Sequence, residues 1–142
     1  GNMANDERRA QYKYSAGDFM IKENALKLVA ALRSGKFIQG KNKLETLDGI
    51  ESKYCCLGVA CLVAEAEGVP VERDYNMIEG TYMNKHEAVA EWLGIKYKGE
   101  STYTLDISAV NHYCNSLISR NDDGLTFAEI ANFIEKHWDV IT

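Results

Sequence analysis

The segment from Tyr54 to Gly68 constrains the fold more than any other part of the chain. Its apolar residues predict a helix over about residues 55–67, and they cover most of the circumference of that helix instead of one face. A helix of this kind belongs at the centre of a hydrophobic core. Gly58 lies inside it although glycine costs a helix about 1 kcal/mol relative to alanine. We therefore expect close packing against another backbone at Gly58.

Apolar residues at helical spacing predict four further helices, over about residues 18–34, 84–93, 108–119 and 126–138. The last of these has the clearest start, because Thr126 and Glu129 stand in capping-box positions. Asn84 and Glu87 have the same spacing at the start of the short helix before Gly94.

Two short hairpins are expected between these helices. The first pairs residues 37–39 with residues 44–47, and the second lies around Gly99 within residues 96–105. Residues 69–83 have the pattern of a loop, with a possible strand at 69–71. The expected fold class is α+β: a helix-rich single domain of about five helices with one or two short β-hairpins.

Length and composition fit one domain, because 142 residues with 46% hydrophobic and 26% charged side chains are ordinary globular values. We expect a flexible N-terminal segment over residues 1–17, in which Gly1 and Asn2 resemble a tag remnant, and a single globular domain over residues 18–142. The polar first ten residues predict no signal peptide, and the short apolar runs predict no membrane span. A cytoplasmic location with reduced cysteines is therefore expected.

The candidate catalytic residues are Cys55, Cys56 and His112. Both cysteines fall at a helix start, where the helix dipole favours a thiolate, and a cysteine nucleophile needs a histidine as its base. The competing interpretation is structural, because cysteine is often buried and Cys56 shares an apolar helix face with Val59. We prefer the structural interpretation, and we regard Cys55 as the better candidate if one thiol is reactive.

Other chemistries receive little support from the sequence. No Cys-x-x-Cys pair occurs, and the acidic turn at residues 121–124 is followed by Ile130 where a calcium-binding loop needs glutamate, so we expect no metal and no cofactor. The net charge of −5 and the scattered basic residues argue against nucleic-acid binding. His86 and His137 are expected at the surface, on helix ends.

The segment Tyr-Cys-Cys-Leu-Gly-Val at residues 54–59 and the segment Asn-Asp-x-Gly-x-Thr-Phe-x-x-Ile-Ala at residues 121–131 resemble a family of small uncharacterised proteins of phages and prophages. Gln39 and the helix end at residues 92–95 also follow the family's order. The chain departs from the family at Arg120, where an apolar leucine is usual. The resemblance implies a viral or mobile-element origin and an accessory role, and it implies no catalytic residue.

The leading hypothesis is therefore an accessory protein that binds a host macromolecule, with a host protein as the expected partner. An acidic surface would favour basic partners. The alternative is a cysteine-dependent hydrolase or transferase that uses Cys55 or Cys56 with His112. A third possibility is a domain that binds a metabolite. Whether the protein is an enzyme stays open at this point.

Overall fold

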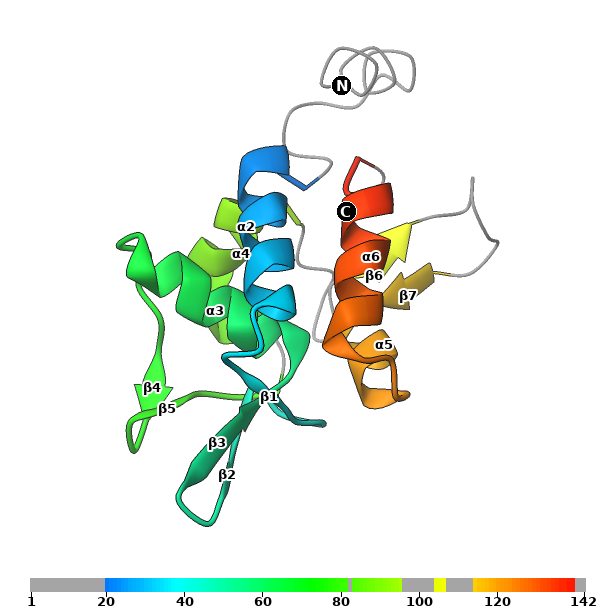
Figure 1. The fold of residues 1–142 in the computed structure, drawn as a ribbon. Helices are drawn as coiled ribbons and strands as arrows, with labels where there is room; N and C mark the ends of the chain where they lie inside the picture. Colours follow the sequence, from blue (N-terminus) through cyan, green and yellow to red (C-terminus); the bar gives the residue numbers. More distant parts are fainter. Residues whose placement is uncertain (1–19, 82, 96–103, 107–113, 140–142) are drawn as a thin grey trace.

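The computed structural model describes residues 20–81, 83–95, 104–106 and 114–139 (Figure 1). The helices are α2 (Lys22–Arg33), α3 (Cys56–Ala66), α4 (Glu87–Leu93), α5 (Leu117–Asp122) and α6 (Phe127–His137). The strands are β1 (Ile38–Gln39), β2 (Glu45–Asp48), β3 (Glu51–Tyr54), β4 (Arg73–Asp74), β5 (Met77–Ile78), β6 (Thr104–Asp106) and β7 (Cys114–Ser116). Five helices with small sheets make an α+β domain, as predicted. None of the helices in this part of the chain has the length and apolar character that a bilayer crossing requires.

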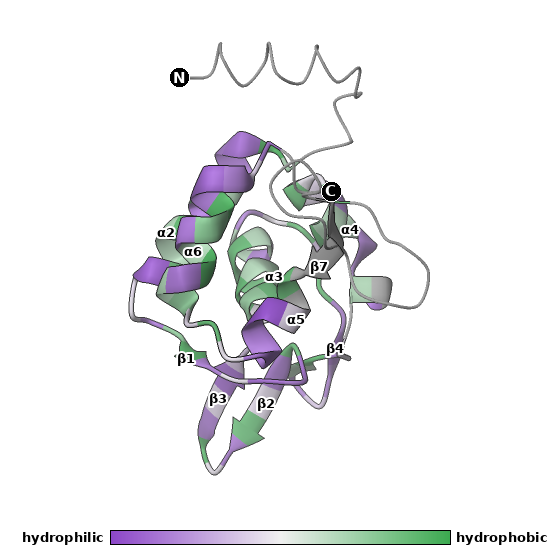
Figure 2. Ribbon diagram, turned by 90° about the vertical axis from the view of Figure 1, so that its right-hand side faces the viewer, coloured by the Kyte–Doolittle hydropathy of each residue, from purple (hydrophilic) through white to green (hydrophobic). Residues whose placement is uncertain are grey.

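Helix α3 packs against α2, α4 and α5, and Figure 2 shows it in the middle of the helices. Residues 56–61 are all buried, so every face of its first turns is covered by other elements. Figure 2 shows α3 as a largely hydrophobic ribbon, with the hydrophilic parts of α2 and α6 toward the outside. The predicted central helix is confirmed. Each large apolar side chain buried in it, such as Leu57, contributes roughly 1.5–3 kcal/mol to folding.

Helices α2 and α6 pack along each other and close one side of the core. Their buried stripes are Ala25, Leu28, Val29 and Leu32 on α2, and Phe127, Ile130, Ala131 and Ile134 on α6. The predicted capping box at the start of α6 is confirmed. The Glu129 amide donates to Thr126 Oγ1 at 3.1 Å, and the Thr126 amide donates to Glu129 Oε1 at 3.1 Å. Local sequence therefore starts α6, and the apolar stripe attaches it to α2.

A three-stranded sheet with the order β1-β3-β2 lies at one end of the helices (Figure 1). Strands β2 and β3 form an antiparallel hairpin, with Glu45 opposite Tyr54 and Asp48 opposite Glu51. Strand β1 pairs with β3 in parallel. The predicted hairpin between residues 37–39 and 44–47 is therefore wrong. The turn at Gly49, which has a φ of 65°, brings β2 back onto β3 instead.

Three further predictions about local structure are corrected. Residues 69–83 contain a small hairpin, β4–β5, and not only a loop. Within the predicted helix over residues 108–119, Cys114–Ser116 form strand β7, which pairs with β6, and α5 begins at Leu117. Helix α4 begins after His86, so the predicted capping box at Asn84 is wrong. In each case a short segment took the conformation that its neighbours in space favour. Gly99 lies outside the described residues.

Candidate functional site

Cys55 and Cys56 lie at the start of α3, but both side chains are buried. Burial raises the pKa of Cys55 to about 11, and it outweighs the hydrogen bonds from the helix-end amides that lower this pKa. Burial also raises the pKa of Cys56 and that of Cys61. These thiols are protonated at neutral pH, whereas a cysteine nucleophile needs a lowered pKa.

The environment of Cys56 is that of a packing residue. Its thiol donates to the carbonyl oxygen of Leu117 at 3.4 Å, which connects α3 to α5. His112 lies outside the described residues, so its pairing with Cys55 or Cys56 stays a prediction. In the part of the chain that is described, no three His, Cys, Asp or Glu side chains are placed to hold a metal ion.

The buried side chain of Asn121 connects three elements that are far apart in the sequence. Its Oδ1 accepts from the backbone amide of Cys56 at 3.1 Å and from Gln39 Nε2 at 2.8 Å. Its Nδ2 donates to the carbonyl oxygen of Gly40 at 2.7 Å. Asn121 therefore caps the N-terminus of α3 from a distance and ties it to β1 and α5.

Gln39 and Asp122 extend this connection. Gln39 Nε2 donates to the carbonyl oxygen of Leu125 at 2.8 Å, and Gln39 Oε1 accepts from the amide of Phe127 at 3.1 Å. Asp122 Oδ1 accepts from the amide of Asn42 at 2.9 Å. The polar groups of this network satisfy one another, which makes the network a structural joint instead of a ligand site.

Gly58 has the close backbone neighbour that the sequence predicted. A Cβ atom at this position would lie 2.9 Å from the carbonyl carbon of Leu44 and still closer to its oxygen. That oxygen also accepts from the amide of Cys55 at 3.3 Å. Through Gly58, Cys56 and Asn121, the two motifs at residues 54–59 and 121–131 thus help to hold α3, β1 and α5 together.

A groove of about 500 Å³ lies between α2 and α3. Its floor consists of small or apolar side chains, including Ala30, Ala31, Phe37, Leu62, Val63 and Ala66. At one end, Lys27 Nζ lies 2.7 Å from Glu67 Oε2, and this contact raises the pKa of Lys27 and lowers that of Glu67. At the rim, Lys36 is exposed and makes no ion pair with any described residue. Apolar hollows with a few polar groups are typical of binding sites.

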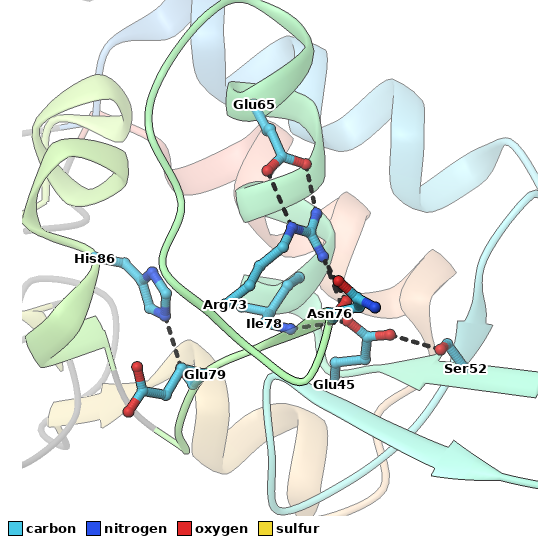
Figure 3. Close-up of polar contacts among 8 residues, drawn as sticks. All are labelled: Glu45, Ser52, Glu65, Arg73, Asn76, Ile78, Glu79 and His86. Carbon is cyan, nitrogen blue, oxygen red and sulfur yellow. Dashed lines mark hydrogen bonds and ion pairs between the residues drawn. The ribbon is translucent and has the colours of Figure 1, made fainter.

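A second group of polar side chains surrounds the β4–β5 hairpin (Figure 3). Glu45 is only 6% exposed, and its carboxylate accepts from Ser52 Oγ at 2.5 Å and from the amide of Ile78 at 2.9 Å. Arg73 donates through Nη2 and Nε to the two carboxylate oxygens of Glu65, at 2.5 and 3.3 Å. Arg73 Nη1 also lies 4.0 Å from Glu45 Oε1. Only Glu45 of these charged side chains is buried, and its satisfied carboxylate holds β2, β3 and β5 in one arrangement, while the more exposed pair of Arg73 and Glu65 links β4 to α3.

His86 belongs to the same region and corrects a prediction. It is 2% exposed and not a surface residue, and its Nε2 lies 2.7 Å from the carbonyl oxygen of Glu79 (Figure 3). The contact joins the end of the β4–β5 hairpin to the start of α4. The sequence contained no signal for this cluster, because Arg73 lies in a predicted loop and Glu45 and His86 belong to other predicted elements far from it in the chain.

These observations define a class of protein: a small α+β domain whose central helix is capped by a distant asparagine and whose surface carries an apolar interhelical groove. The chain belongs to the family described as domain of unknown function (DUF8296), whose model matches residues 20–138. Comparison with curated proteins and with solved structures gives no significant match.

Proposed function

We propose that the protein is an accessory protein of a phage or another mobile element, and that it acts in the host cytoplasm by binding a host protein. The groove between α2 and α3 carries this proposal. It is hollow, lined mostly by apolar side chains, and formed by two helices of the folded core, so it needs no rearrangement to accept a ligand. An apolar side chain of the partner would fill it, in the manner of helix-in-groove recognition.

The resemblance to phage and prophage proteins supports the accessory role. The motifs that carry the resemblance connect elements of the fold, and the side chains of their two cysteines are buried. The raised pKa of Cys55 argues against the alternative of a cysteine-dependent hydrolase or transferase. At the rim of the groove, Lys36 favours a partner that carries an acidic residue beside the apolar one.

Filling the groove tests the proposal. Ala30 and Ala66 are exposed and line the groove, so the variants Ala30→Arg and Ala66→Arg place a long side chain in it without disturbing the core. Arginine is a good helix former, so both variants should fold. Ala128→Arg on α6 is the matched control, because Ala128 is exposed and lies outside the groove.

Affinity capture from host lysate, followed by a binding titration with the purified partner, provides the measurement. We expect a saturable partner that binds the wild type and Ala128→Arg equally, and that binds Ala30→Arg at least about tenfold more weakly, which is about 1.4 kcal/mol. A captured protein that binds all of these variants equally would refute the groove as the site. Failure to capture any saturable partner at several salt concentrations would refute the binding function.

A further inference from the structure

The tip of the β4–β5 hairpin presents an aromatic side chain to solvent. Tyr75 and Asn76 form a two-residue turn between Asp74 and Met77, and their φ angles are 49° and 66°. Such turns favour Asn-Gly, because a bulky side chain at positive φ is strained. Tyr75 is nevertheless 93% exposed, so it contributes little to the core. Packing against the residues that the structure describes does not explain why a tyrosine occupies the position.

The hairpin is held rigidly although its strands are only two residues long. Arg73 spans the turn, because its Nη1 donates to the carbonyl oxygen of Asn76 at 3.1 Å while its other nitrogens hold Glu65 (Figure 3). The buried carboxylate of Glu45 fixes the amide of Ile78 on the opposite strand. Residues outside the hairpin thus fix the position of its tip, and such preorganisation lowers the entropy lost when a partner binds.

A cleft of about 260 Å³ opens beside this tip. Tyr75 and Met77 supply aromatic and apolar lining, while three carboxylates (Glu45, Asp74 and Glu79) face one amine, Lys43. Glu45 is held by Ser52 and Ile78, and Glu79 by Lys85 at 2.6 Å. Asp74 makes no ion pair with any residue that the structure describes, so its carboxylate is available to a ligand.

We infer that this cleft binds a cationic side chain of a partner protein, with arginine preferred over lysine. The Tyr75 ring would pack on the guanidinium by stacking and cation–π contact, and Asp74 would supply the counter-charge. Arg73 lies 4.0 Å from Glu45 and Lys85 lies 2.6 Å from Glu79, so Asp74 is the carboxylate of the cleft that is left to complement a cation, and Lys43 in the lining opposes one. This surface is separate from the groove between α2 and α3, and it takes ligands of a different chemistry.

Short peptides test the inference. An amide-resolved NMR titration would use acetylated and amidated Gly-Arg-Gly, with Gly-Lys-Gly, Gly-Leu-Gly and Gly-Glu-Gly for comparison. We expect saturable shifts at the amides of residues 73–80 with the arginine peptide, smaller shifts with lysine, and none with leucine or glutamate. Tyr75→Ala and Asp74→Asn should each weaken binding of the arginine peptide about two- to fivefold. Lys43→Ala should strengthen binding of the arginine peptide. A purely structural role for these residues would not produce such a gain in affinity.

The matched controls are Ile50→Ala, a fully exposed apolar residue at the other hairpin tip, and Asp123→Asn, an exposed acid in the turn before α6. Both should bind like the wild type, and so should the groove variant Ala30→Arg. Tyr75, Asp74, Lys43, Ile50 and Asp123 are all exposed, so shortening or neutralising their side chains removes no core contact. The amide spectrum of each variant, including Ala30→Arg, reports its fold. Equal binding of the arginine and glutamate peptides, or unchanged binding by both Tyr75→Ala and Asp74→Asn, would overturn the inference and leave the groove proposal untouched.

Discussion

Replacing Gly58 by alanine should destabilise the protein, although the same change stabilises most helices. In an open helix the substitution gains about 1 kcal/mol from helix propensity. Here the new Cβ atom would lie 2.9 Å from the carbonyl carbon of Leu44 and closer to its oxygen, and that backbone cannot turn aside as a flexible side chain can.

The magnitude follows from three contributions. Over-packing costs about 1–3 kcal/mol, and backbone against backbone belongs at the upper end of that range. Moving Leu44 away also weakens its 3.3 Å hydrogen bond from the Cys55 amide, which contributes about 1 kcal/mol. After subtracting the gain in helix propensity, the net loss is about 2–3 kcal/mol in the free energy of unfolding.

Urea denaturation monitored by circular dichroism measures this loss. The urea concentration at the midpoint of unfolding should fall, while the dependence of the free energy of unfolding on urea concentration should stay unchanged. Ala30→Gly, at an exposed position within α2, is the control, and it should lose about 1 kcal/mol from helix propensity alone. If Gly58→Ala is as stable as the wild type or more stable, then the close approach of α3 to Leu44 is wrong.

Three further results are expected. At pH 8, Cys55 in the native protein should be alkylated about 100-fold more slowly than Cys55 in the unfolded chain, because burial raises its pKa to about 11. Mass spectrometry identifies the alkylated site. Fast alkylation with an apparent pKa below about 8.5 would instead favour the hydrolase alternative. Asn121→Ala should lower the free energy of unfolding, measured by urea denaturation, by about 2–4 kcal/mol, because buried backbone amide and carbonyl groups lose their partner. The exposed control Asn132→Ala should stay within about 1 kcal/mol of the wild type. Equal losses in the two variants would refute the structural role of Asn121. Arg33 lowers the pKa of Glu135 in the folded state. The stabilisation from this pair is therefore complete at pH values above the pKa of Glu135 in the unfolded chain, and it is lost as the pH falls through the lower pKa of the folded state. The urea midpoint of Glu135→Gln should therefore fall less between about pH 6 and about pH 3 than that of the wild type, and identical pH profiles would contradict the ion pair.

The candidate site was only partly accessible from sequence. Cys55 was correctly predicted at a helix start. Its burial could not be predicted from the neighbouring sequence, because the residues that cover it are brought there by the tertiary fold. Gly58 was correctly expected at a close approach, whereas its neighbour Leu44 was not identified. The role of Asn121 was also missed. Asparagine is common in turns, so the sequence predicted only that Asn121 belongs to the acidic turn and not that it caps α3.

Local interactions are what the amino-acid sequence determined by itself. The capping box at Thr126, the stripe along α6 and the all-round apolar helix α3 each depend on residues within a few positions of one another, so their pattern predicts them. The tertiary structure alone decided the parallel pairing of β1 with β3 and the burial of Glu45. Strands of two to four residues carry too little periodic signal to choose a partner. Their pairing, and with it the cleft beside Tyr75, depends on contacts that form only when distant segments meet.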